Sequence, residues 1–148
     1  MINENISKLK LLAEDIQDLH VFSAYLQDSV IVVNDIKFLP KTKKLICVFN
    51  RFMWEDAEKG IFRKNKRIRS ALVFDNVIKV KSKEINPKKR TKILEFLAIK
   101  TEIKDNYFDI RLIFSGDSVL LIKAEEIASS LEDFGKTWET SYKPKHKI

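Results

Sequence analysis

The sequence has one cysteine, three glycines, three prolines and no long apolar run. A single cysteine, Cys47, excludes an internal disulfide framework and fits a reducing compartment. The apolar runs, such as 30–33 and 119–122, are far shorter than the roughly 20 residues of a membrane helix. The N-terminus has no apolar stretch of signal-peptide length. We therefore expect a cytoplasmic protein with no membrane span.

Scarce glycine and proline also leave little room for flexible linkers. A chain of 148 residues suits one domain, large enough to bury a real core. We expect a single domain over residues 1–148, with 1–10 and 139–148 loosely ordered.

Positive charge is in excess, with 28 basic against 21 acidic residues and a net charge of +7. This excess suggests an anionic partner. However, 22 of the cations are lysine and six are arginine, and arginine is the better bidentate ligand of phosphate and guanine. Two interpretations stay open: genomic bias with a solvated surface, or a functional anionic partner.

The apolar periodicity changes twice along the chain. Ile16, Leu19, Phe22 and Leu26 recur at helical spacing within 11–28, and Asp15 is placed to cap that helix. Alternating or β-branched segments separated by turn residues then predict about eight strands. These segments are 30–33, 36–39, 44–52, 68–74, 77–82, 93–103, 107–115 and 118–123.

A second amphipathic helix is predicted at 124–135. Ile127, Leu131 and Phe134 form its apolar stripe, Glu125 suits its first turn, and Gly135 suits the position after its end. The fold class is therefore α+β. We expect a mainly antiparallel curved sheet or partly open barrel in pleckstrin-homology-like order, with an N-terminal and a C-terminal helix.

No catalytic, metal or cofactor motif stands out, so we expect no metal and no cofactor, and an enzyme is disfavoured. Cys47 lies between Ile46 and Val48 in a predicted strand, where a small core residue is expected rather than a nucleophile. The two histidines, His20 and His146, lack partners at metal-ligand spacing.

The end of the strand at 44–52 is the most suggestive stretch, because sites are often built at strand ends. Arg51 and Trp54 suit a cation–π or ligand-stacking platform. Alternatively, Trp54 covers the end of the core and Arg51 pairs with Glu55. The candidate ligand or partner rim comprises Asn50, Arg51, Trp54, Glu55, Gln27 and Asp28. An enzyme would require Asn50, Arg51, Glu55 and Asp28 to converge in a cleft.

A second candidate site is a cluster of cations in neighbouring segments. The candidate anion-binding residues are Arg63, Lys64, Lys66, Arg67, Arg69, Lys88, Lys89 and Arg90. Only Phe62 and Phe74 lie near them, whereas nucleic-acid binders usually interleave aromatics with cations.

Several segments resemble a family of uncharacterised alphaproteobacterial proteins, the domain of unknown function 2948. The resemblance rests on 25–30, 38–41, 50–52 with Trp54 and Glu55, 71–77 and 131–138, in order along nearly the whole chain. Met53 stands where we expect an acid in the family, and the chain is richer in lysine. The family has no established activity, so the resemblance implies kinship and a bacterial cytosol.

These observations favour a non-catalytic binding or interaction module whose partner is a protein or a small anionic ligand. The alternative is a nucleic-acid or anionic-surface binder that uses a face rich in lysine and arginine.

Overall fold

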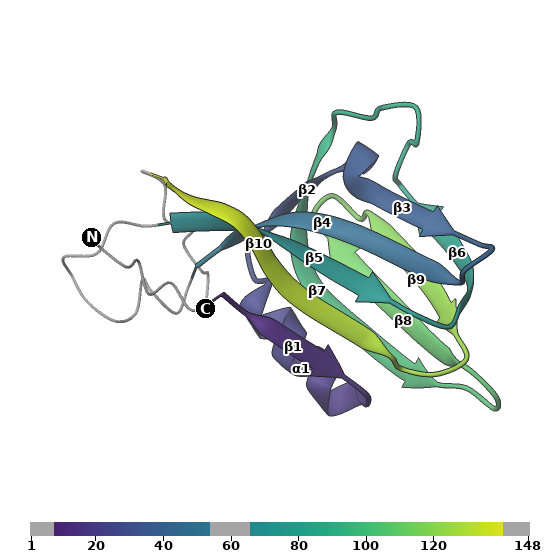
Figure 1. Cartoon of the computed structure of the whole chain (residues 1–148). Helices are drawn as coiled ribbons and strands as arrows, with labels where there is room; N and C mark the ends of the chain where they lie inside the picture. Colours follow the sequence, from purple (N-terminus) through teal and green to yellow (C-terminus); the bar gives the residue numbers. More distant parts are fainter. Residues whose placement is uncertain (1–7, 54–65, 141–148) are drawn as a thin grey trace.

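A computed structural model of the protein describes residues 8–53 and 66–140, which form a strand-rich fold (Figure 1). The elements in chain order are β1 (Lys10–Ala13), α1 (Ile16–Tyr25), β2 (Val30–Val32), the 3-10 helix η1 (Val33–Asp35), β3 (Ile36–Leu39), β4 (Lys44–Phe52), β5 (Lys66–Phe74), β6 (Val77–Lys83), β7 (Ile93–Ile103), β8 (Phe108–Phe114), β9 (Val119–Ala124) and β10 (Ser129–Glu139). All eight predicted strands are present, within one or two residues at their ends.

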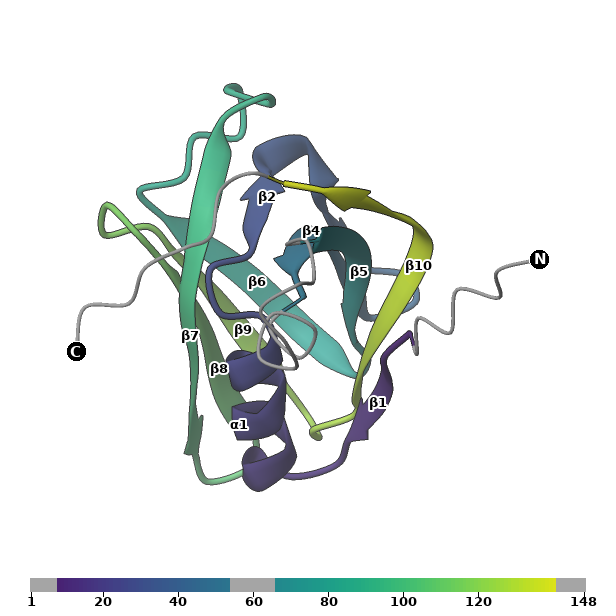
Figure 2. The same ribbon diagram turned by 90° about the vertical axis from the view of Figure 1, so that its left-hand side faces the viewer.

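The strands form one antiparallel sheet in the order β1-β10-β5-β4-β2-β7-β8-β9-β6, with β3 beside β4. Within the described chain this order does not return on itself, so β1 and β6 are the two ends of an unclosed sheet. The sheet is strongly curved (Figure 2). Strand β2 links a first half, β1-β10-β5-β4 with β3, to a second half, β7-β8-β9-β6.

Helix α1 lies against β7 and β1 (Figure 2). Asp15 caps it as predicted, because its carboxylate accepts a hydrogen bond of 2.8 Å from the Asp18 N–H. Leu19 and Phe22 point into the core. The Ser23 hydroxyl accepts a hydrogen bond of 3.1 Å from Ile99 N–H on β7, so the helix also satisfies part of that strand's edge. Residues 11–13, predicted as the start of this helix, belong to β1.

An aromatic cluster joins the inner faces of the two halves. Phe49 of β4 meets Phe96 of β7 edge-on at 5.7 Å between centroids, and Phe114 of β8 lies 6.5 Å from Phe49. All three rings are buried. Because inward residues alternate with outward ones along each strand, the outer faces remain available for other contacts.

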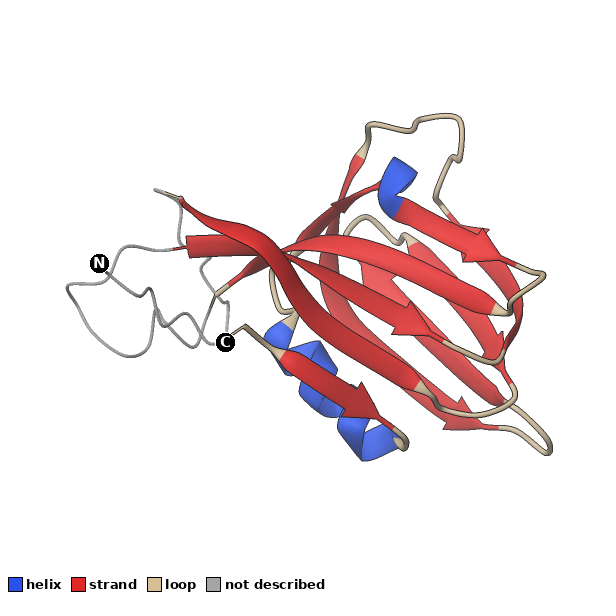
Figure 3. Cartoon of the chain, in the orientation of Figure 1, coloured by secondary structure: helices blue, strands red, loops and turns tan. Residues whose placement is uncertain are grey.

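The prediction of a C-terminal helix is wrong. Residues 129–139 form strand β10, which pairs with β5 and β1 (Figure 3). Leu131 and Asp133 point inward and Phe134 points outward, so the spacing of Ile127, Leu131 and Phe134 is not a helical stripe. The buried Asp133 hides the period of two, because a charged residue occupies a core-facing position.

The pleckstrin-homology-like order is not confirmed, since its closing helix is replaced by this strand. Within the described residues, no helix is long and apolar enough to cross a membrane.

Candidate functional site

Arg51, the centre of the predicted rim, is fully buried and faces inward from β4. Its Nε and Nη2 donate to Asp133 Oδ1 and Oδ2 at 3.0 and 2.7 Å, a bidentate ion pair with β10. Its guanidinium carbon lies 5.8 Å from the centroid of the Tyr25 ring at the end of α1. The ion pair therefore joins the helix to two strands.

The Asp133 carboxylate is surrounded by donors. Besides Arg51, the Ser70 hydroxyl on β5 donates to Oδ1, and Leu9 N–H donates to Oδ2 at 3.0 Å. The Leu9 carbonyl in turn accepts from Asp133 N–H at 2.9 Å. A buried carboxylate needs such partners, because desolvation is costly. This arrangement holds three strands and the segment before β1 together, and the buried guanidinium is not accessible to a partner.

Of the other predicted rim residues, Asp28 and Asn50 lie beside Arg67. The Arg67 guanidinium donates to the carbonyls of Asp28 and Asn50, at 3.4 and 3.2 Å, and lies over the Phe52 ring. Gln27 is exposed and Asn50 is half-buried. Trp54 and Glu55 lie outside the described residues.

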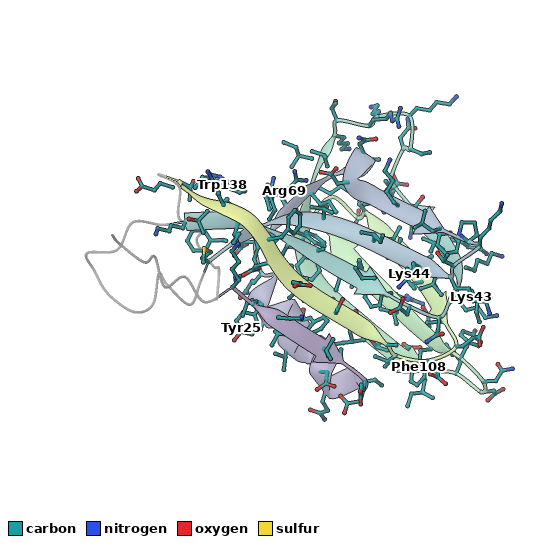
Figure 4. The ribbon with its side chains drawn as sticks, in the orientation of Figure 1. Tyr25, Lys43, Lys44, Arg69, Phe108 and Trp138 are labelled. Carbon is teal, nitrogen blue, oxygen red and sulfur yellow. The ribbon has the colours of Figure 1, made fainter. Side chains whose placement is uncertain are left out.

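The predicted anion-binding cations are dispersed. Arg69 (Figure 4) is exposed on β5. It pairs with Asp35 at 3.4 Å and lies over the Phe134 ring. Lys66 lines an open hollow of about 430 Å³ together with Trp138. Lys88, Lys89 and Arg90 are exposed in the loop between β6 and β7, where Arg90 Nε donates to Asn34 at 3.2 Å. Arg63 and Lys64 lie outside the described residues.

A second group of cations, absent from the predicted set, lies on the outer face of the second half of the sheet. We call this surface the basic face. Its cations are Lys79, Lys81 and Lys83 of β6, Lys100 of β7, Arg111 of β8 and Lys123 of β9. The strand register brings these residues from four strands onto one surface, because antiparallel partners point to the same side.

The register divides the basic face into three rows that cross the strands. The central row is Lys100, Arg111, Leu121 and Lys81; one flanking row is Ala98, Ile113, Val119 and Lys83; the other is Glu102, Asp109, Lys123 and Lys79. Neighbouring rows are about 7 Å apart, two residues along a strand. The face thus changes from apolar at one end to charged at the other.

Four lysines of the basic face are not paired with an acid in the described part of the chain. Among the described residues, Lys79, Lys81, Lys83 and Lys100 make no hydrogen bond or ion pair through their side chains. Their mutual repulsion is unfavourable at low salt. A bound anion would relieve it.

The two carboxylates of the basic face are already engaged. Glu102 accepts a hydrogen bond of 2.9 Å from Lys104, and this bond and the lysine charge lower the pKa of Glu102. Asp109 pairs with Arg111 at 3.4 Å. The Lys123 ammonium lies 4.3 Å from the centroid of the Tyr107 ring. Because Glu102 and Asp109 are engaged in these contacts, the unpaired lysines are the main source of positive electrostatic potential on the basic face.

The apolar row borders an open hollow of about 490 Å³. Leu97, Ile113 and Val119 line it, together with the cations Lys83 and Arg111 and the acids Glu84 and Asp117. Leu97 is 53% exposed, although it is a large apolar side chain in a strand. Leu97 follows the inward Phe96 and so points outward, and a bulge in β7 between Phe96 and Ala98 leaves it without a partner on β8. The hollow therefore offers apolar contact beside charges of both signs.

A signal for the basic face was present in the sequence. Lys79, Lys81 and Lys83 alternate with Ile78, Val80 and Ser82, and a period of two in a strand places alternate residues on one face. Lys100, Arg111 and Lys123 could not be added to them without the strand order, because β6 pairs with β9 rather than with β7.

Cys47 is a core residue rather than a nucleophile, as its position in the strand predicted. Burial raises the pKa of its thiol from 9.0 to about 12, because the thiolate is poorly solvated in an apolar core. Unfolding releases that thiol to ionise near pH 9. Stability from the protonated thiol is therefore complete below pH 9 and is lost as pH rises toward 12.

We expect the free energy of unfolding of the wild type, relative to Cys47→Ala, to fall by about 1.4 kcal/mol per pH unit above pH 9. Urea denaturation of both proteins from pH 8 to 11 measures this difference, and the variant controls for lysines and tyrosines that titrate in the same range. A difference that stays constant with pH would contradict the buried thiol.

Comparison with known proteins gives kinship but no activity. A family model described as "Protein of unknown function (DUF2948)" matches residues 9–146, as the resemblance in the sequence indicated. No curated protein and no solved structure matches the chain.

Proposed function

We propose that this chain, which belongs to the DUF2948 family, is a non-catalytic interaction module that binds a macromolecular partner through its basic face. The observation that carries the proposal is the set of four unpaired lysines beside exposed apolar side chains, all on rigid paired strands. Complementary charge steers a protein partner to such a surface, and exposed apolar side chains supply contact area. We also propose that the module acts in the cytoplasm, which the free cysteine supports.

A protein partner fits the composition of the basic face better than a nucleic acid does. Five of its six cations are lysines, whereas arginine is the more frequent reader of phosphate and bases. Its neighbouring aromatic ring, Tyr107, is already in contact with Lys123, and base stacking requires an open ring. Leu97, Ile113 and Val119 add apolar area that a phosphate backbone would not use.

The nucleic-acid alternative is favoured by the six cations considered alone. Contacts to phosphate dominate such binding and make it steeply dependent on salt. The experiment below therefore distinguishes a protein adduct from a nucleic-acid adduct.

Site-specific photo-crosslinking in the native cells tests the proposal. The photoreactive amino acid p-benzoylphenylalanine replaces Leu121, at the centre of the basic face. In a matched control it replaces Ala71, which is equally half-buried but lies on the outer face of β5. We expect a discrete adduct from position 121 and none from position 71. Digestion with protease or nuclease then identifies the class of partner.

Charge reversal provides the specificity control for this experiment. The pair Lys81→Glu and Lys100→Glu changes the central row, and the pair Lys88→Glu and Lys89→Glu changes net charge equally in an exposed loop. The adduct should disappear with the first pair and persist with the second. Equal adducts from positions 121 and 71, or no adduct from 121, would refute the proposed surface.

A further inference from the structure

We infer that the partner segment is acidic and amphipathic: it places large apolar side chains in the hollow beside Leu97 and carboxylates on the central lysine row. This inference rests on the proposed function and names the chemistry of the partner. It follows from the order of the three rows on the basic face: an apolar row, a basic row and a row of mixed charge. A uniformly charged polymer would not complement this order.

The apolar row offers a place for large apolar side chains of the partner. Leu97 is 53% exposed, and Ile113 and Val119 are half-buried around the same hollow of about 490 Å³, which Glu84 and Asp117 also line. Such a hollow is large enough for one or two apolar side chains. Covering it would remove apolar surface from water at about 25 cal/mol per Å². The partner should therefore carry Leu, Ile, Met or an aromatic residue.

The central row lies about 7 Å from the apolar row and offers positive charge to the partner. Lys81 and Lys100 lie at its two ends, on strands β6 and β7, and neither forms an ion pair with a described residue; Glu102, two residues from Lys100, is bonded to Lys104 instead. Three strand spacings separate them, or about 14 Å. Carboxylates on one side of a segment whose other side is apolar would reach both lysines.

The remaining row contains two carboxylates and therefore limits how anionic the partner can be. Glu102 and Asp109 lie there between Lys100, Arg111 and Lys123. A polymer with a negative charge at every position would meet these carboxylates, and like charges placed together oppose binding. A segment with its acids confined to one stripe avoids them.

Selection from a library of random displayed dodecapeptides against the full chain tests the inference. We expect enriched peptides that combine Asp or Glu with large apolar residues. The binding constant of one synthetic enriched peptide is then measured by fluorescence anisotropy, with polyglutamate and an oligothymidylate as competing probes. Both competitors should bind more weakly than the peptide.

Two pairs of matched variants locate the bound peptide. Affinity should fall about tenfold or more in Lys81→Glu with Lys100→Glu, and remain unchanged in Lys88→Glu with Lys89→Glu. It should also fall about fivefold in Leu97→Ser, because a buried apolar contact is lost. The control Leu12→Ser removes a side chain that is 71% exposed on β1, far from the basic face, and should have no effect.

The outcomes separate this inference from the proposed function. If polyglutamate competes as well as the peptide, or Leu97→Ser has no effect, the apolar part of the inference is wrong although the basic face still binds. If the oligothymidylate binds more tightly, the partner is a nucleic acid. No enrichment, or enriched peptides insensitive to both pairs of variants, overturns the inference, and the crosslinking result still decides the proposed function independently.

Discussion

Replacing Asp133 by asparagine is expected to cost about 3–5 kcal/mol of the free energy of unfolding, because the Arg51 charge then stays buried without its carboxylate. Both side chains are completely buried, and they share two short hydrogen bonds. A loss of this size is a large part of the roughly 5–15 kcal/mol that stabilises a typical domain. Urea denaturation, followed through its midpoint and slope, measures the change.

Two further variants separate the ion pair from packing. Glu132→Gln alters the adjacent, exposed acid of β10 and should change stability by no more than about 0.5 kcal/mol. The double variant Arg51→Met with Asp133→Leu removes both charges and should recover much of the loss, as replaced buried ion pairs often do. An Asp133→Asn variant as stable as wild type would contradict the role assigned to the pair.

The strands were predictable because their inner positions are apolar and their turns carry recognisable residues. In β8, Ile110, Leu112 and Phe114 are buried and alternate with Asp109, Arg111 and Ile113. That period of two is a local property, so one sequence suffices to find it. The pairing of β6 with β9, and of β10 with β1 and β5, depends on contacts distant in sequence, and no local pattern encodes it.

The C-terminal segment shows how a buried polar residue defeats a pattern. Ser129 and Asp133 occupy inward positions of β10, so its inner face is polar at two of three sites. Leu131 alone remains apolar there, and Phe134 points outward. The spacing of the apolar residues Ile127, Leu131 and Phe134 therefore matched a helix better than a strand. A carboxylate lies inside because Arg51, two strands away in the same sheet, pairs with it, and Ser70 and the Leu9 N–H donate to it as well.

Arg51 could be singled out from the sequence, but its surroundings could not. It was predicted as part of a ligand or partner rim, whereas in the structure it is buried against Asp133, which lies in a segment wrongly predicted as a helix. The lysines at 79, 81 and 83 followed a strand pattern, but their neighbours Lys100 and Lys123 come from other strands. A surface assembled from four strands exists only after the sheet order is known.

Replacing Phe49 by alanine is expected to cost about 3–5 kcal/mol, the usual range for a large aromatic side chain lost from a core. Its ring joins β4 to β7 and β8 through Phe96 and Phe114, at 5.7 and 6.5 Å between centroids. Contacts between such rings add about 0.5–1.5 kcal/mol beyond the area that they bury. The variant thus removes a contact that joins the two halves of the sheet.

Phe134→Ala is the matched control for this change, because that ring is 40% exposed on the outer face. It should cost less than about 1 kcal/mol, since little of its area lies in the core. Phe49→Leu, which leaves a smaller cavity, should lie between the two alanine variants. Equal losses for Phe49→Ala and Phe134→Ala would mean that the aromatic cluster does not hold the halves together. Strands β7 and β8 carry two rings of the cluster on their inner face and Lys100 and Arg111 of the basic face on their outer face. A larger loss for Phe49→Ala than for Phe134→Ala would therefore mean that this cluster supports the strands that form the basic face.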